Sequence, residues 1–248
     1  MVALLAFALL GATVVGIAGA ETPASGPDPV VTRWAKWPYR VGCATLTFDP
    51  VRAFSRPTRA ERGSGAAEAA LRDFLVSADA AGIPRHDWRL LARTAERAEF
   101  GRGRLESDEG LSWLGLARTG AGWVVDGPWS CRPRTIRDGI PAADWVLPEA
   151  PLPDPSARSV VLGVHERACT GARDPVPHLM KPHIRYGEKA IVVTLWVRPP
   201  DGPNTCPGNP IGWLRLKLPG RLGNRALYDG GTYPPRPVQP GEDPRRLR

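Results

Sequence analysis

The chain has 248 residues, of which 42% are hydrophobic and 23% charged, and its formal net charge is +8. This composition fits one large or two small globular domains, and its frequent glycine and proline follow no collagen-like period. Only four of the 33 basic residues are lysine, and the body of the chain has no arginine-rich run with interleaved aromatic residues. We therefore attribute the charge to an arginine-rich composition and expect no specific nucleic-acid site. The alternative is a polyanionic partner such as a nucleic acid, a teichoic-type polymer or an anionic lipid.

Residues 1–20 form an apolar segment without a charged side chain. Ala18 and Ala20 make an Ala-x-Ala site before Glu21, which is typical of a secretory signal peptide. A segment of this length could also cross a bilayer, so an uncleaved membrane anchor is the alternative. We expect export in both cases. A linker should follow over residues 21–30, which are rich in proline and small residues.

Residues 31–146 predict an α+β domain. Its first part, residues 33–40, mixes basic and aromatic side chains that we expect to cover the edge of the domain, a membrane interface being the alternative. Residues 41–48 alternate in polarity, as in a strand that carries Cys43 on its polar face.

The clearest predicted helix covers residues 66–81, where apolar side chains recur at helical spacing. Ser64 is placed to cap its start, and Gly82 is placed to end it. Four short runs follow, separated by glycine-containing turns: 88–94, 98–102, 111–118 and 123–125. They predict an antiparallel meander whose apolar face packs on the helix.

Residues 147–158 contain four prolines and predict a linker between two domains. The second domain, residues 159–235, should be a small, all-β, sandwich-like domain, and residues 236–248 should form a disordered tail. The second domain contains three strand-like runs: residues 159–165, 190–197 and 213–218. The middle run is apolar on both faces, so we place it centrally in a sheet, whereas the last run alternates and should be half-buried.

The four cysteines carry the most specific signal in the sequence. None has a Cys-x-x-Cys spacing, and an even number in an exported chain favours disulfides. Pairing Cys43 with Cys131, and Cys169 with Cys206, keeps each bridge inside one predicted domain. The second bridge opposes a simple hairpin of the first two strands of that domain, so we expect these strands to be parallel or in different sheets.

No catalytic motif is present, neither a Gly-x-Ser-x-Gly elbow nor a phosphate loop nor a dinucleotide fingerprint. His178 and His183 lie five residues apart among prolines, which does not favour a zinc pair. His165 and Glu166 could tune each other as an acid/base pair, but neighbours on a strand point to opposite faces. We expect no catalytic residue, no metal and no cofactor.

Three motifs near the C-terminus resemble a group of uncharacterised secreted proteins and lipoproteins from actinomycete bacteria. They are His165-Glu166-Arg167-Ala-Cys169, Cys206-Pro-Gly-Asn-Pro210, and Pro219 to Gly231 with its Gly-Asn-Arg and Asp-Gly-Gly steps. The resemblance implies a location outside the cytoplasm and brings no activity or cofactor with it. The chain departs from the group because it lacks a lipobox cysteine and has Asn224 where aspartate is expected.

The physical interpretation of these motifs is mainly architectural. Cys206–Pro210 has the composition of a tight turn, and Arg225 and Asp229, four residues apart, are expected to form an ion pair. The alternative is a polar binding site, for which the weak candidates are His165, Glu166, Asn209, Arg225 and Asp229.

We expect an exported, disulfide-stabilised, non-catalytic binding protein whose partner is an envelope protein or polymer. One alternative is a secreted hydrolase with His165 or His183 as its base. The other is a purely structural envelope protein.

Overall fold

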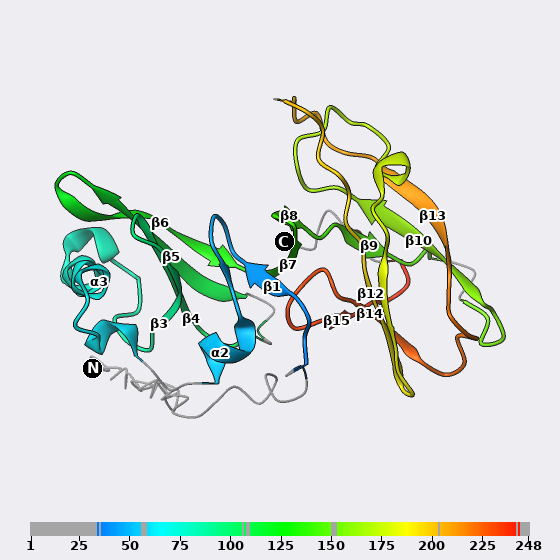
Figure 1. Ribbon diagram of the computed structural model, residues 1–248, viewed down its shortest axis with the longest axis horizontal. Coiled ribbons are helices and arrows are strands. Elements are labelled where there is room, and N and C mark those ends of the chain that lie inside the picture. The colour runs from blue at the N-terminus through cyan, green and yellow to red at the C-terminus, as the bar shows by residue number, and fades with distance from the viewer. Residues whose placement is uncertain are drawn as a thin grey trace, which may run out of the picture.

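In the computed structural model, the chain is mostly β-structure, with one α-helix longer than two turns in its described part. The described residues are 34, 36–55, 59–105, 107, 110–149, 153–202, 204–241 and 243. The predicted signal peptide or anchor and the linker at residues 21–30 lie outside them. The described strands form four small sheets, antiparallel except for one parallel pair (Figure 1).

The first half of the chain contains the predicted helix and meander, at the left of Figure 1. Helix α3 (Ala66–Val76) shares a hydrophobic core with a sheet of strand order β3-β4-β5-β6. Leu71 and Leu75 of the helix lie in this core with Phe100 and Leu114 of the sheet, as the apolar periodicity predicted. The strands are β3 (Arg89–Arg93), β4 (Arg97–Arg102), β5 (Leu111–Thr119) and β6 (Gly122–Cys131).

Helix α3 is shorter than the predicted helix over residues 66–81. It ends at Val76, and the C-cap residue Ser77 has an extended backbone and an Oγ that donates a hydrogen bond of 2.8 Å to the carbonyl of Phe74. A serine that bonds its own backbone in this way competes with further helix. The predicted cap by Ser64 is wrong, because the N-cap residue is Gly65 and no side chain caps the helix. Short 3-10 helices lie on either side of α3: η1 (Ala60–Arg62) and η2 (Ala78–Ala80).

The predicted single strand over residues 41–48 is also wrong, because this segment folds into a hairpin. Strands β1 (Arg40–Gly42) and β2 (Thr47–Phe48) pair with each other around a turn, and helix α2 (Pro50–Phe54) follows. The hairpin extends into a sheet of order β2-β1-β7-β8, completed by β7 (Arg134–Arg137) and β8 (Ile140–Pro141). Tertiary contacts of the turn at Cys43, Thr45 and Leu46 override the strand pattern.

The strands from β9 to β15 build two sheets that face each other, at the right of Figure 1. One has the order β13-β10-β9 and the other the order β11-β12-β14-β15. Val160, Leu162 and Val164 of the first sheet share a core with Ile191 and Val193 of the second. The strands are β9 (Asp144–Val146), β10 (Ser159–His165), β11 (His183–Tyr186), β12 (Ala190–Thr194), β13 (Ile211–Lys217), β14 (Ala226–Asp229) and β15 (Arg236–Pro237), with η3 (Val176–His178) between β10 and β11.

Several expectations for this region are met. The first two predicted strands, β10 and β12, lie in different sheets, and β12 is an inner strand. Strand β11 was not predicted, and the predicted tail needs correction at its start. Arg236 and Pro237 pair with β14 as strand β15, and Val238 is buried. The strand was not predicted because the predicted tail is rich in proline and polar residues.

Both predicted disulfides are confirmed. The Cα atoms of Cys43 and Cys131 are 5.5 Å apart, and those of Cys169 and Cys206 are 4.5 Å apart, distances at which cysteines are bridged. The first bridge ties the end of β1 to the end of β6, and the second ties the segment after β10 to the segment before β13. The protein is therefore stabilised by two disulfides.

Contacts cross the predicted linker at many points, so the two-domain division is not confirmed and stays a prediction. Strand β9 precedes the linker but pairs with β10, which follows it. The amide of Thr135 donates to the carbonyl of Gly231 (3.0 Å), and the amide of Tyr233 donates to the carbonyl of Pro133 (2.9 Å).

The aromatic residues near the start of the described chain close the junction between the two halves. Trp34 and Trp37 are buried in a core that also contains Val192 and Tyr233 from the last third of the chain. The ring centroids of Trp37 and Tyr233 are 6.2 Å apart. These two residues are therefore part of a core, whereas the sequence led us to expect that they cover the edge of a domain.

Candidate functional site

The five residues singled out from the sequence as weak binding candidates do not form one site. Glu166 and Asn209 lie together beside the Cys169–Cys206 bridge, whereas Arg225 lies near the β11–β12 turn. Asp229 is fully buried at the end of β14. His165 ends β10, opposite Asp144 of β9 and Ile211 of β13.

Asn209 holds the loop around the second disulfide. Its Nδ2 donates to the carbonyls of Glu166 and Ala168, both at 2.6 Å, and its Oδ1 accepts from the hydroxyl of Thr170 at 2.7 Å. The buried carboxylate of Glu166 accepts two hydrogen bonds from Arg173, at 2.8 and 3.3 Å. Both side chains therefore have structural partners in the segments that this disulfide joins.

The predicted ion pair between Arg225 and Asp229 is wrong. Arg225 donates instead to the carbonyls of Gly187 (2.7 Å) and Leu222 (3.1 Å), and its guanidinium lies 4.6 Å from the ring centre of Tyr186. The two residues flank an extended strand, in which four residues span about 13 Å. A spacing of four brings side chains together on a helix but not on a strand.

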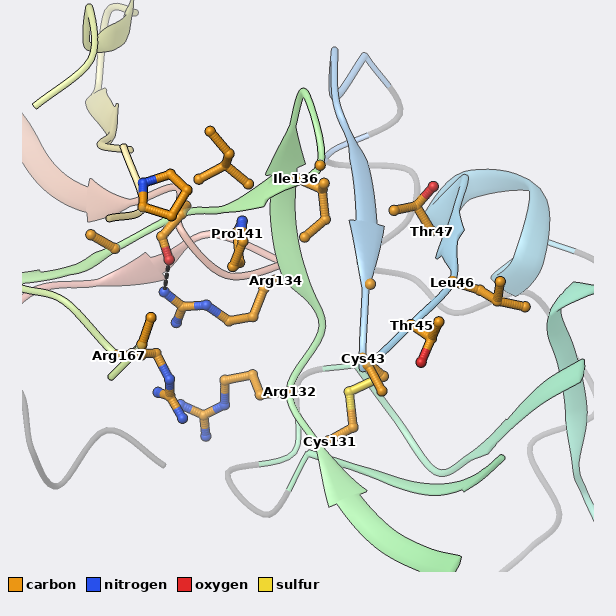
Figure 2. A pocket seen from close by; sticks show the side chains of 18 of the residues that line it. Cys43, Thr45, Leu46, Thr47, Cys131, Arg132, Arg134, Ile136, Pro141 and Arg167 are labelled. Carbon is orange, nitrogen blue, oxygen red and sulfur yellow. Dashed lines mark hydrogen bonds between the residues drawn. A yellow bond between two sulfur atoms is a disulfide. The ribbon is translucent and has the colours of Figure 1, made fainter. Parts of the chain in front are cut away.

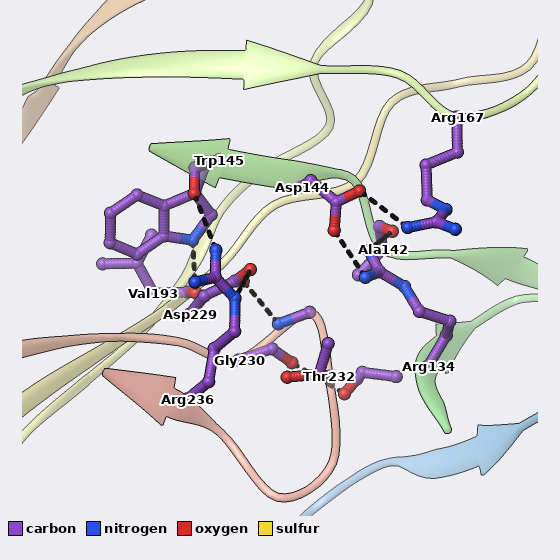
Figure 3. Close-up of polar contacts among 12 residues, drawn as sticks. Arg134, Ala142, Asp144, Trp145, Arg167, Val193, Asp229, Gly230, Thr232 and Arg236 are labelled. Atoms are coloured by element: carbon purple, nitrogen blue, oxygen red, sulfur yellow. Dashed lines mark hydrogen bonds and ion pairs between the residues drawn. The ribbon is translucent and has the colours of Figure 1, made fainter. Parts of the chain in front are cut away.

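Asp229 belongs instead to a network of buried ion pairs at the junction of the two halves (Figure 3). Its Oδ1 accepts from the amide of Gly231 at 2.7 Å, and its Oδ2 lies 3.6 Å from Nε of Arg236. Burial raises the pKa of Asp229 to about 6, and the nearby guanidinium groups of Arg236 and Arg134 offset this rise only in part.

Asp144 is the second buried acid of this network, with 1% of its side chain exposed. Its Oδ1 lies 2.5 Å from Nη1 of Arg134, and its Oδ2 lies 3.1 Å from Nη1 of Arg167. Arg134 also donates to the carbonyl of Ala142 at 2.5 Å. One carboxylate thus positions two arginines that come from β7 and from the segment after β10 (Figure 3).

These two arginines face a cavity of about 730 Å³ between the halves of the molecule (Figure 2). Its walls come from the β1–β2 hairpin, the end of β6, the β7–β8 hairpin, and the segments after β10 and β12. Arg132 joins Arg134 and Arg167 in the lining, and in Figure 2 the side chains of Arg132 and Arg167 reach toward each other from two sides. The larger apolar side chains of the lining are Leu46, Ile136, Ile140, Pro141, Val197 and Pro199.

The hairpin that forms one wall of this cavity is held by Glu99, a fully buried residue of β4. Its Oε1 accepts from the amides of Thr45 (3.1 Å) and Leu46 (2.8 Å), and its Oε2 accepts from Nε1 of Trp113 (3.3 Å). The Cys43–Cys131 bridge lies in the same wall. This part of the cavity is therefore preorganised by a disulfide and a buried carboxylate.

Sequence reasoning missed the cavity and its ion pairs. The available signal was an acid within an apolar run, as at Asp144 in Ala-Ala-Asp-Trp-Val and at Glu99 in Ala-Glu-Phe. Charged side chains are rarely buried unless they are paired. Such positions therefore indicate a buried partner without identifying it.

A second cavity, of about 860 Å³, lies between the β1–β2 hairpin, helix α2 and strand β3. Its lining contains several arginines, and three of them are bound by neighbouring side chains. Arg93 pairs with Glu68 at 3.1 Å, Arg59 pairs with Asp87 at 3.2 Å, and Arg40 donates to Thr47 at 2.9 Å. The first cavity is therefore the stronger candidate.

The remaining histidines do not converge on either cavity. The ring of His183 on β11 lies 5.2 Å from the ring of Tyr39, and burial and the charges of Arg137 and Arg185 lower the pKa of this histidine. His178 ends the short helix η3. Across the described residues, no group of three or more His, Cys, Asp and Glu side chains is placed to hold a metal ion.

Two exposed tryptophans have a packing role. Trp213 lies opposite Gly163 in the β10–β13 pair, and a Cβ atom at Gly163 would lie 3.0 Å from its ring. Trp129 covers Gly127 on its own strand in the same way, since a Cβ there would lie 2.7 Å from its indole nitrogen. Each ring thus covers a backbone that has no side chain of its own.

Comparison with known proteins adds no relative. No protein-family model, no curated protein and no solved structure matches the chain. Within the part of the chain that the structure describes, no helix is long and apolar enough to cross a membrane.

Proposed function

We propose that the chain is an exported protein of the cell envelope that binds a partner molecule without converting it. The observation that carries this proposal is the cavity of about 730 Å³ between the two halves, with its wall of arginines. Ligand sites are typically concave, largely preformed, and lined by apolar groups with a few well-placed polar ones. The two disulfides support the location, because such bonds persist mainly in oxidising compartments.

Binding is favoured over catalysis because the acids nearest the cavity already have partners. Asp144 accepts from Arg134 and Arg167, and Glu166 accepts from Arg173. Carboxylate oxygens that already accept from guanidinium groups are less available to take a proton from a bound molecule. Its effect here is to position the arginines.

A secreted hydrolase is the second candidate, and one observation favours it. His165 faces Asp144 across the β9–β10 pair. Its neighbour in sequence, Glu166, lines the cavity together with Ser130. Turnover of ester, peptide or glycan substrates that is lost in His165→Ala would establish this alternative and contradict the binding proposal.

The binding proposal is tested by filling the cavity. Ile140→Trp places a large ring at a half-buried position of the lining, and Val124→Trp places the same ring at an exposed position on β6 as a control. We expect the unaltered protein and the Val124 variant to retain a molecule from envelope extract that the Ile140 variant loses. Equal recovery by all three proteins would contradict binding at this cavity. If none of the three recovers a molecule, a purely structural role is favoured.

The proposed location has its own test. Fractionation of cells that produce the full chain should find it outside the cytoplasm, with all four cysteines oxidised. Recovery in the cytoplasm with free thiols would contradict export.

A further inference from the structure

We infer that the cavity receives an acidic group, a carboxylate or a phosphate, that is carried on an apolar body. This inference rests on the proposed binding function and specifies the ligand of the same site. It comes from the charge, the geometry and the apolar lining of the cavity, each of which restricts the ligand separately.

Arginines outnumber acids among the described residues of the lining. Of the described residues that line the cavity, three are arginines, and the single acid, Glu166, is bound by Arg173 from outside the lining. Asp144 lies behind Arg134 and Arg167 and gives a separate oxygen to each of them. Among the described residues, one carboxylate thus pairs with two guanidinium groups, and Arg132 lines the same cavity.

The geometry of these arginines suits an oxyanion. A guanidinium presents its N–H groups in a planar fork that matches the oxygens of a carboxylate or a phosphate. Asp144 takes Nη1 of Arg167, while 46% of the side chain of this arginine stays exposed. Arg134 is fixed from behind by Asp144 and by the carbonyl of Ala142. Groups that are positioned before binding lose less conformational freedom when the ligand arrives.

The rest of the lining requires an apolar body. Away from the arginines, the larger side chains are those of Leu46, Ile136, Ile140, Pro141, Val197 and Pro199. A free phosphate ion would leave these groups in contact with water, whereas an acyl chain or a ring would cover them. A volume of about 730 Å³ lies in the range that holds small organic ligands.

The experiment is calorimetric titration of the full oxidised protein with four probes below their micelle concentrations. They are decanoate, decyl phosphate, decanol and inorganic phosphate. We expect binding of decanoate or decyl phosphate, at least tenfold weaker binding of decanol, and weaker binding still of inorganic phosphate. The ratio of the affinities for decanoate and decyl phosphate decides whether the site prefers a carboxylate or a phosphate.

Two substitutions locate the acidic group. Arg167→Gln and Arg132→Gln should each lower the affinity for the more tightly bound anion by about 10- to 100-fold, the range for a hydrogen bond between charged groups. Arg215→Gln removes an exposed arginine of β13 that does not line the cavity and should leave the affinity unchanged. Arg134 is avoided because its loss would leave Asp144 buried without this partner. Thermal unfolding of each variant verifies that it is folded.

The outcomes separate this inference from the proposed function. The claim that the ligand carries an acidic group would be overturned if decanol binds as tightly as decanoate. It would also be overturned if neither substitution changes the affinity for the anions. Absence of binding by both anions would overturn the inference as a whole. In each case, a molecule lost only from the Ile140→Trp variant would still support binding at the cavity.

Discussion

At the scale of single residues, the clearest consequence concerns the charge of Asp229. Burial raises its pKa from an ordinary value of 3.8 to about 6. Between these two pH values the folded protein therefore retains a proton that the unfolded chain has lost. The free energy of unfolding should fall as the pH rises through this window, by on the order of 3 kcal/mol. We expect Asp229→Asn to remove this fall, because asparagine cannot ionise and can still accept from the amide of Gly231.

Urea unfolding of both proteins at pH 4, 5, 6 and 7 measures this effect. Asp73→Asn, at an exposed position of α3, is the matched control and should preserve the pH dependence of the unaltered protein. A difference between the Asp229 variant and the unaltered protein that stays constant from pH 4 to pH 7 would contradict the prediction.

Single residues were predictable where chemistry restricts their partners, and not elsewhere. The four cysteines were expected to bond to one another, so the predicted linker was enough to select both pairs. A buried carboxylate can take any guanidinium or amide that the fold brings to it. The partners of Asp144 come from positions 134 and 167, on either side of the predicted linker. No local spacing carries that information, and the helical spacing rule misled for Arg225 because its segment is extended.

At the scale of elements, local periodicity predicted the regions in which one face is buried against a neighbour. Helix α3 and the meander from β3 to β6 follow this rule, as does the alternation of β13. The hairpin of β1 and β2 departs from it, because its turn is determined by Glu99 and by the bridge to Cys131. Strand β15 has only two residues, so it has no period to detect.

The two disulfides connect different elements and should differ in their resistance to reduction. Cys169 and Cys206 are both exposed, whereas Cys131 is buried with 8% of its surface accessible. Attack on a disulfide requires access to a sulfur atom. We therefore expect a rising concentration of dithiothreitol to open Cys169–Cys206 first, as measured by alkylation and mass spectrometry. Opening of Cys43–Cys131 at the lower concentration would contradict this order.

Removal of each bridge should also have a different functional effect. Chain-entropy arguments give about 4.6 kcal/mol for a loop of 88 residues and about 3.8 kcal/mol for a loop of 37. Both losses should therefore lower the denaturation midpoint by similar amounts. The Cys43→Ser/Cys131→Ser protein should in addition bind the cavity ligand more weakly, because this bridge lies in the cavity wall. Cys43 and Cys131 themselves line the cavity, whereas Cys169 only neighbours the lining residue Ala168, so the Cys169→Ser/Cys206→Ser protein should lose less affinity.

At the scale of the whole molecule, the two predicted domains share buried structure. The indole of Trp145, which is fully buried, donates to the carbonyl of Val193 at 3.0 Å. The amide of Ala143 donates to the carbonyl of Leu195 at 2.9 Å, and the hydroxyl of Thr135 donates to the carbonyl of Gly230 at 2.7 Å. The cavity itself draws its lining from both sides of the linker. Composition predicted a linker, but composition carries no information on contacts between the segments on its two sides.

These contacts lead us to expect that the two halves stay together after the chain is cut at the linker. No disulfide crosses residues 147–158, so only non-covalent contacts could hold them. Separation would expose the core of Trp37, Val192 and Tyr233 to water and would take Asp144 away from Arg167.

A protease site inserted between Glu149 and Pro153, cleaved in the folded protein, should yield two fragments that co-elute in gel filtration. They should separate only in denaturant, and neither should unfold cooperatively alone. The uncut chain with the same insertion is the control. Fragments that part on dilution and each unfold cooperatively would establish two independent domains.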